Sequence, residues 1–331
     1  MPPQTKGTLE CVPAETHLQR PIIVLGMHRS GTSLVAELID KCGAFGNDEF
    51  LPADYRNPQG YWEYAPLVHF NRRLLASVRS QSFVPPSDQD ERTLRERASL
   101  SPWKSEATQL ISAMEVGERG WYWKDPRLAV MLPFWQQFWG EAVFVIAVRE
   151  PSDTALSLEK RDKLPLTAGY LLWQRYMTAA LKHTEREPRR IFVQYERLLA
   201  EPVRECRRLC GFLEAHCRLT ETKTLGQRVD SMIAAVNPKL RSNSSPTSFF
   251  ATPNVIEGQK SLYRYLQSKA NDQDEVIGSG AFDIYPGWRD YLQALAALDE
   301  LRDTLKENQL GLFAKLEHKL SRKVPTKQPP W

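Results

Sequence analysis

Short, continuous apolar runs recur along the chain, each bounded by proline, glycine or charged residues. Four of them predict strands, at 21–26 (PIIVLG), 121–124 (WYWK), 142–148 (AVFVIAV) and 190–195 (RIFVQY). Runs of this length and composition are typical of strands that are buried on both faces of a parallel sheet.

The segments between these runs place apolar residues at helical spacing. They predict helices at 33–41, 66–78, 91–116 (broken at Pro102), 127–139, 151–161, 166–185 and 203–213. Strands that alternate with helices indicate an α/β fold, in which helices flank both faces of a P-loop-like parallel sheet.

The two ends of the chain differ from this central pattern. We predict that residues 1–20 are a flexible tail and that residues 21–245 form one domain. Residues 246–331 predict a loop and a helical C-terminal extension packed on the same domain, with leucines at helical spacing over 288–318. Two roles remain open for that helix, namely packing on the core or pairing with a second copy in a homodimer.

Composition argues against several classes of function. A formal net charge of +4 is too small to indicate a nucleic-acid partner, although it is compatible with a local basic pocket. We find no signal-peptide h-region in residues 1–18 and no apolar stretch that approaches a membrane span. The five cysteines show no zinc-ligand spacing and indicate reduced thiols. We therefore expect a cytoplasmic enzyme of bacterial style.

The loop between the first strand and the first helix, 26–33 (GMHRSGTS), carries the strongest chemical signal. A helix N-terminus favours an anion, and glycines at both ends of the loop let the backbone approach it. The loop matches the Walker pattern except that Thr32 occupies the position of its lysine, while Arg29 supplies a basic side chain. We expect it to hold phosphate-like oxygens, but not those of ATP.

This loop resembles the 5′-phosphosulfate loop of sulfotransferases, most closely the bacterial branch and the protein-tyrosine sulfotransferases. The resemblance implies 3′-phosphoadenosine 5′-phosphosulfate (PAPS) as the donor, PAP as the product, and no required metal. Arg29 would then grip the phosphosulfate. His28 replaces the family's common proline and either packs the loop or donates to an oxyanion. The remaining residues would wrap the 5′-phosphate: Ser30, Gly31, Thr32 and Ser33.

A second anionic site is needed because PAPS also carries a 3′-phosphate. After the run 142–148, Arg149 and Ser157 resemble the 3′-phosphate motif R-[DN]-P-x-D-x-x-x-S, with a glutamate at the second position. An arginine at a strand end can bind phosphate in bidentate fashion. The resemblance also places Tyr195 near the adenine. Arg241 either closes over the cofactor or lies on the surface.

Two further segments resemble the family's catalytic parts. The run 57–63 (NPQGYWE) supplies Glu63 as general base, because a carboxylate beside aromatic rings has a raised pKa. His69 is the second candidate for that base. In 123–127 (WKDPR), Lys124 would support the leaving group, and Asp125 would hold Lys124 or cap the next helix.

Several alternatives remain open. Arg127 either binds an acidic acceptor or pairs with a carboxylate. The acceptor, a small or carrier-bound molecule with a hydroxyl or amine, is not identified by the sequence. A P-loop kinase or NTPase is the rival function. A cluster of aromatic residues either stacks on the acceptor or packs in the core: Tyr61, Trp62, Tyr64, Trp121 and Trp123.

Overall fold

The sheet of this protein has four parallel strands in the order β2-β1-β3-β4. The computed structural model describes residues 20–54, 57, 60–115, 120–219, 222–237, 245–253, 255–273 and 287–297. The strands are β1 (Ile22–Leu25), β2 (Tyr122–Lys124), β3 (Val143–Val148) and β4 (Arg190–Gln194). In register, Ile22 pairs with both Tyr122 and Val143. The expected parallel α/β sheet is confirmed.

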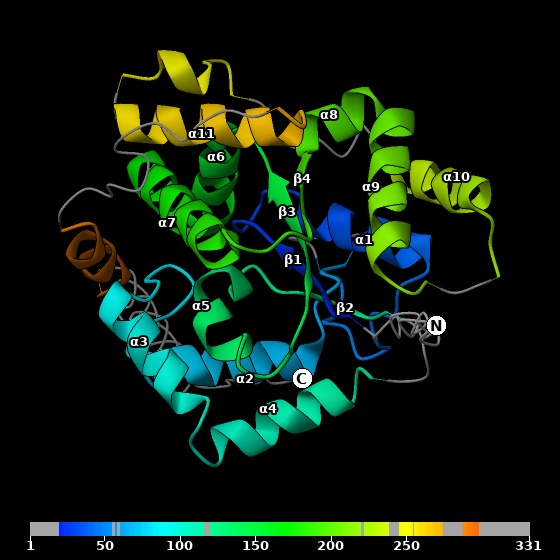
Figure 1. The fold of residues 1–331 in the computed structure, drawn as a ribbon. Coiled ribbons are helices and arrows are strands. Elements are labelled where there is room, and N and C mark those ends of the chain that lie inside the picture. The colour runs from blue at the N-terminus through cyan, green and yellow to red at the C-terminus, as the bar shows by residue number, and fades with distance from the viewer. Residues whose placement is uncertain are drawn as a thin grey trace, which may run out of the picture.

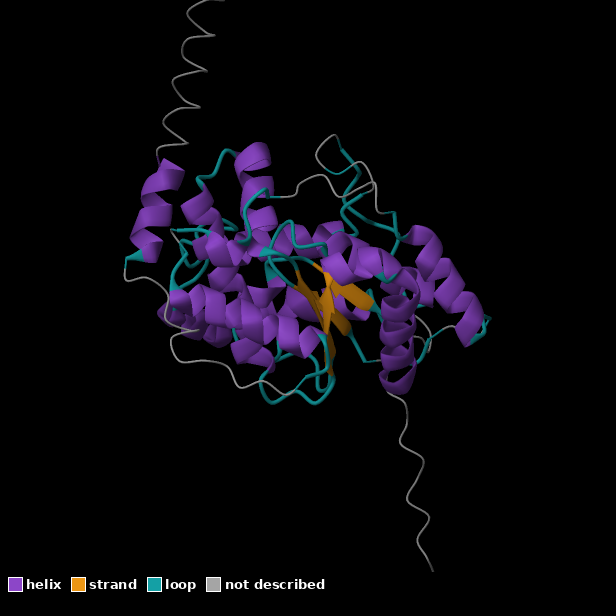
Figure 2. Ribbon diagram, turned by 90° about the horizontal axis from the view of Figure 1, so that it is seen from above, coloured by secondary structure: helices purple, strands orange, loops and turns teal. Residues whose placement is uncertain are grey.

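Helices cover both faces of the sheet, which runs through the centre of the molecule (Figure 1, Figure 2). One face is covered by α1 (Thr32–Cys42), α8 (Tyr195–Ala200), α9 (Pro202–His216) and α10 (Leu225–Ala235). The helices on the other side are α2 (Ala65–Ala76), α3 (Asp88–Arg97), α4 (Trp103–Ser112), α5 (Leu128–Trp135), α6 (Pro151–Asp162), α7 (Leu166–Thr184) and α11 (Glu257–Ala270).

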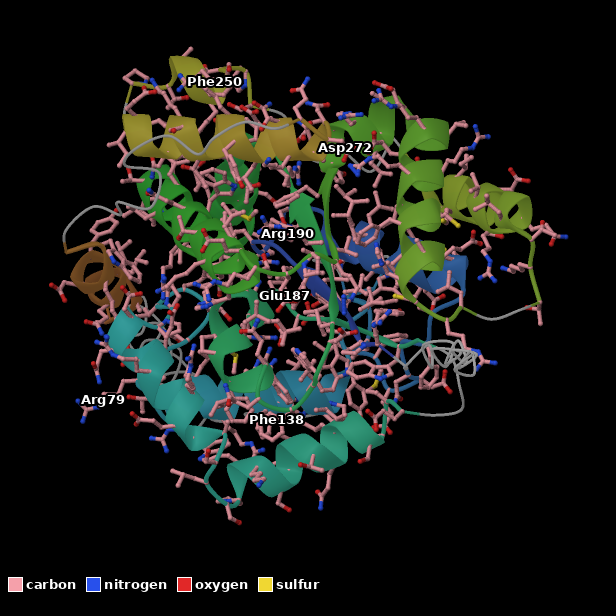
Figure 3. The ribbon with its side chains drawn as sticks, in the orientation of Figure 1. Arg79, Phe138, Glu187, Arg190, Phe250 and Asp272 are labelled. Carbon is pink, nitrogen blue, oxygen red and sulfur yellow. The ribbon has the colours of Figure 1, made fainter. Side chains whose placement is uncertain are left out.

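Alternate residues of each strand serve two separate cores. Ile22 and Val24 of β1 pack with α1 and α9, whereas Ile23 and Leu25 pack with the helices on the opposite face. Side chains fill the space between the sheet and both helical layers (Figure 3). Burial of both faces explains why the strands read as continuous apolar runs rather than as alternating ones.

Several observed boundaries differ from the predicted ones. Tyr195 begins α8 instead of ending β4, and α5 stops at Trp135 because the chain turns over residues 136–138. The sequence did not predict α8 and α10, and it did not give the bounds of α11 within the expected helical extension. The predicted break at Pro102 is confirmed, since α3 and α4 lie on either side of it.

The described part of the C-terminal extension packs on the body of this chain. In α11, Leu262 and Tyr263 are buried in the same core as the sheet. Residues 288–297 are helical, and Leu292 is buried there too. Residues 1–19 of the predicted tail (1–20) and the part of the predicted helix (288–318) that follows residue 297 lie outside the described residues. No helix in the described ranges is long and apolar enough to cross a membrane.

Candidate active site

The loop between β1 and α1 has a backbone that only glycine accommodates well at two positions. Gly26 has φ 146° and Gly31 has φ 88°. A Cβ on Gly31 would lie 2.5 Å from the Tyr195 ring, and one on Gly26 would lie 2.9 Å from the Ala147 carbonyl oxygen. The Ser30 hydroxyl donates to the Met27 carbonyl (2.6 Å) and so shapes the loop from within.

This loop lines a cavity of about 160 Å³. Residues at or just after the carboxyl ends of β2 and β3, Lys124 and Arg149, also line it. Most of the expected site residues line it, although they come from distant parts of the sequence. They are His28, Arg29, Gly31, Thr32, Ser33, Glu63, Lys124, Arg149 and Tyr195.

The cavity is strongly cationic. Arg29, Lys124, Arg149 and Arg161 line it together with one carboxylate, that of Glu63, among the described residues. Burial, followed by the charges of Arg161 and Arg149, lowers the pKa of Arg29 from its ordinary value. An anionic ligand would offset this crowding of positive charge.

Arg149 ties the loop to the end of β3. Its Nη1 donates to the Arg29 carbonyl oxygen (2.9 Å), and its guanidinium lies 4.6 Å from the centre of the Tyr195 ring. The Ser157 hydroxyl, expected near Arg149, instead accepts a hydrogen bond from Arg29 Nε (2.8 Å). Ser157 therefore orients the arginine of the loop.

Glu63 and Lys124 form a buried ion pair at the opposite wall. Lys124 Nζ lies 2.7 Å from Glu63 Oε1 and also donates to the Tyr61 carbonyl oxygen (2.9 Å). Arg127 Nη2 lies 3.4 Å from Glu63 Oε2. The described ion-pair partners of Glu63 are thus two cations, which the sequence did not predict. Among the described contacts, one of the three Lys124 donors is left for a ligand.

A buried network fixes the direction of Arg127. Asp125 accepts from Arg127 Nε (2.8 Å) and from Asn71 Nδ2 (2.8 Å), and Trp135 Nε1 donates to Asn71 Oδ1 (2.9 Å). Asp125 Oδ1 also accepts from the backbone N–H of Arg127 (3.0 Å), directly before α5. In the described contacts Asp125 thus holds Arg127 rather than Lys124 and also binds the backbone at the start of the helix, as one of the two expected roles requires.

His28 has one face on the cavity and packs against aromatic rings. Its ring centre lies 5.5 Å from that of Tyr176 and 5.9 Å from that of Phe83. Burial, and then the positive charges of Arg127, Arg161, Lys124 and Arg29, lowers the pKa of His28 well below its usual range. The imidazole is therefore neutral near pH 7, which favours the packing role.

Other expected residues lie elsewhere. His69 is exposed on α2 and is not among the cavity residues, so geometry favours Glu63 over it as the base. Arg241 lies outside the described residues. Of the aromatic cluster, Trp121 and Trp123 are buried in the core, and Tyr61 lines the cavity.

Arg161 and Asn237 also line the cavity, and the motifs did not predict them. Arg161 lies one helical turn after Ser157 in α6, so this i, i+4 spacing could have indicated it. No cluster of three or more potential metal-ligating side chains occurs in the part of the chain that the structure describes.

Comparison with known proteins identifies the family. A family model described as "Sulfotransferase family" matches residues 21–218, well over half of the chain. This chain belongs to the sulfotransferase family. The matched range holds every cavity residue named above except Asn237. A search of curated proteins finds no match.

Three solved structures illustrate how distant the known relatives of this sulfotransferase are. The sulfotransferase domain of the Synechococcus PCC 7002 olefin synthase is 16% identical over 78% of this chain and 97% of its own, with a TM-score of 0.43. Sulfotransferase STF9 from Mycobacterium avium is 18% identical over 79% of each chain, with a TM-score of 0.45. Retinol dehydratase, solved with androsterone and the inactive cofactor PAP, is 15% identical over 83% of this chain and 84% of its own, with a TM-score of 0.34. These similarities are too low to transfer the role of any residue.

Proposed function

We propose that this sulfotransferase transfers the sulfuryl group of PAPS to a hydroxyl or amine of its acceptor, with Glu63 as general base. The observation that carries this proposal is the cavity itself, which places four cations and one carboxylate around the loop at the start of α1. A donor with a phosphosulfate and a 3′-phosphate requires cations of this kind and number.

The contacts suggest a role for each group. Arg29 and the N-terminus of α1 bind the phosphosulfate, and Arg149, beside Tyr195, binds the 3′-phosphate. The adenine lies along Tyr195.

The chemical step is an in-line displacement at sulfur. The acceptor oxygen forms a bond to sulfur, the bond between sulfur and the bridging oxygen breaks, and PAP leaves with that electron pair. The acceptor proton goes to Glu63. As Glu63 is neutralised, its attraction for Lys124, 2.7 Å away, falls. Lys124 then stabilises the charge that develops on the leaving phosphate.

Calorimetric titration tests the choice of nucleotide. PAP should bind at least about tenfold more tightly than 5′-AMP, because charge-assisted hydrogen bonds to a phosphate contribute about 1.5–3 kcal/mol each. ATP with Mg²⁺ should bind weakly. If ATP with Mg²⁺ binds as tightly as PAP, the donor assignment is wrong and a kinase-like reaction becomes the better proposal.

A further inference from the structure

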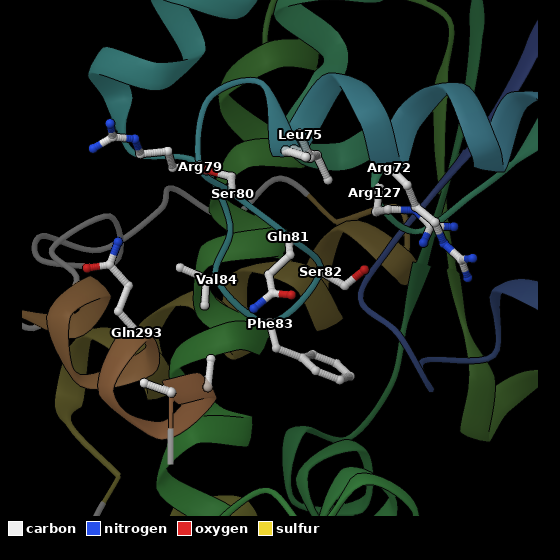
Figure 4. Close-up of a pocket in the computed structure, with 13 residues that line it drawn as sticks. Arg72, Leu75, Arg79, Ser80, Gln81, Ser82, Phe83, Val84, Arg127 and Gln293 are labelled. Atoms are coloured by element: carbon white, nitrogen blue, oxygen red, sulfur yellow. The ribbon is translucent and has the colours of Figure 1, made fainter. Parts of the chain in front are cut away.

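A second and larger cavity has a volume of about 710 Å³ (Figure 4). The end of α2, the loop 80–84 and the helix 288–297 form its walls. Its volume falls within the range of small-molecule pockets in proteins.

The lining of this cavity combines apolar surface with uncompensated positive charge. Leu75, Phe83 and Val84 supply apolar walls, and Arg72 and Arg79 are exposed at its edge. Neither of these two arginines pairs with a carboxylate among the described residues, and no described aspartate or glutamate lines the cavity. Arg79 extends away from the body of the protein (Figure 3). A ligand with an apolar part and a negative group matches these walls.

The two cavities meet at the reaction centre. Arg127 lines the second cavity, and its Nη2 lies 3.4 Å from Oε2 of Glu63, which lines the first. Phe83 of the second cavity contacts His28 of the first, with ring centres 5.9 Å apart. In Figure 4, Arg127 and Arg79 lie on opposite sides of the cavity. A molecule in the second cavity therefore has one end near the candidate base.

The C-terminal extension completes this cavity. Gln293 and Ala296 line it from the helix 288–297, which begins 70 residues after the family match ends at 218. Arg289 holds that helix in place through Asp90 Oδ2 (2.9 Å) and the Ser80 hydroxyl (3.1 Å). The part of the chain without a recognised motif thus contributes a wall next to the reaction centre.

We infer that the second cavity binds the acceptor, and that the acceptor is an amphipathic molecule with a hydroxyl at one end and a carboxylate or phosphate at the other. This inference rests on the proposed function. The hydroxyl faces Arg127 and Glu63, the apolar body lies against α2 and the loop 80–84, and Arg79 binds the acidic group at the exposed mouth. Arg72 lies on the side of Arg127 (Figure 4).

Three probes of equal length test the inference: 8-hydroxyoctanoate, 8-hydroxyoctyl phosphate and uncharged 1,8-octanediol. Each is titrated into the protein with and without PAP and then assayed with PAPS. We expect at least one anionic probe to bind about tenfold or more tightly than the diol. Preference for the carboxylate or for the phosphate identifies the acidic group, and either preference supports the inference. Equal binding of all three, or no binding, overturns it.

A variant connects the preference to Arg79. Arg79→Gln should remove the preference for the anionic probe and leave diol binding within about twofold. Arg73→Gln is the matched control, because Arg73 is exposed on α2 but pairs with Glu106 away from the cavity. If Arg73→Gln weakens binding of the anionic probe as much as Arg79→Gln does, the inference fails.

PAP affinity separates this inference from the proposed function. Arg79→Gln should bind PAP as the wild type does, because Arg79 does not line the first cavity. If the protein does not bind PAP but still binds an anionic probe more tightly than the diol, this result would contradict the proposed function alone. If the protein binds PAP but binds the anionic probes no more tightly than the diol, this result would contradict the acceptor assignment alone.

Discussion

Replacement of Glu91 by glutamine should destabilise the fold strongly and in a pH-dependent way. Glu91 is buried on α3 and pairs with Arg175 of α7. Its other oxygen lies 3.3 Å from His183 Nε2 and 3.4 Å from Lys182 Nζ. This network joins α3 to α7 beside the second cavity. A neutral amide would leave the buried guanidinium of Arg175 without its carboxylate partner.

The magnitude follows from the pKa of the carboxyl group. Burial alone would raise this pKa, but the nearby His183 side chain and the charges of Arg175 and Lys182 outweigh burial and lower the pKa of Glu91 from 4.5 to about 2. That difference corresponds to roughly 3 kcal/mol of folding free energy near pH 7. Because the folded pKa is the lower one, the stabilisation is complete above about pH 4.5 and is lost as pH falls through about 2.

Urea unfolding followed by tryptophan fluorescence measures the effect. At pH 7 the free energy of unfolding of Glu91→Gln should be roughly 3 kcal/mol lower than that of the wild type. This difference should fall to about half at pH 3. Glu96→Gln is the matched control, since Glu96 is exposed on the same helix and should change stability by less than about 0.5 kcal/mol. A gap that stays constant from pH 7 to pH 3, or one no larger than that of the control, would refute the reasoning.

Three further substitutions test the site itself. Glu63→Gln should lower kcat by about 10²- to 10⁴-fold with any accepted probe while PAP affinity stays within about threefold; unchanged turnover at saturating substrate contradicts the base assignment. Lys124→Met should lower kcat by about 10²-fold or more, measured as PAP release from PAPS, whereas an effect confined to KM would mean that Lys124 only binds substrate. Gly31→Ala should weaken PAP binding at least about tenfold in a calorimetric titration, because its Cβ would collide with the Tyr195 ring at a φ of 88°. Wild-type affinity in this variant would show that the observed loop is not the bound one.

Much of the first cavity could be predicted because the sheet is parallel. The carboxyl ends of parallel strands meet at one edge, so the loop after β1, Lys124 at the end of β2 and Arg149 after β3 had to lie close together. It was harder to predict which way a side chain on a helix would face. His69 lies on the exposed side of α2, and Ser157 faces Arg29 rather than Arg149.

Contacts between distant segments could not be read from local patterns. The two cationic partners of Glu63, Lys124 and Arg127, lie 61 and 64 positions later in the sequence. The second cavity joins the loop 80–84 to residues 293–297, more than 200 positions later. Pairings of that kind depend on tertiary packing, which leaves no periodic signal in the sequence.

The most direct test of the account is a two-by-two comparison of PAP and 5′-AMP binding to the wild type and to Arg149→Gln. The account predicts that Arg149→Gln weakens PAP about 10- to 100-fold and 5′-AMP only slightly, because the lost guanidinium binds the 3′-phosphate that 5′-AMP lacks. The ratio of the two effects cancels any general change in the loop that Arg149 also contacts. Equal weakening of both nucleotides would contradict the assignment of Arg149 to the 3′-phosphate, and with it the claim that this cavity is built for PAPS.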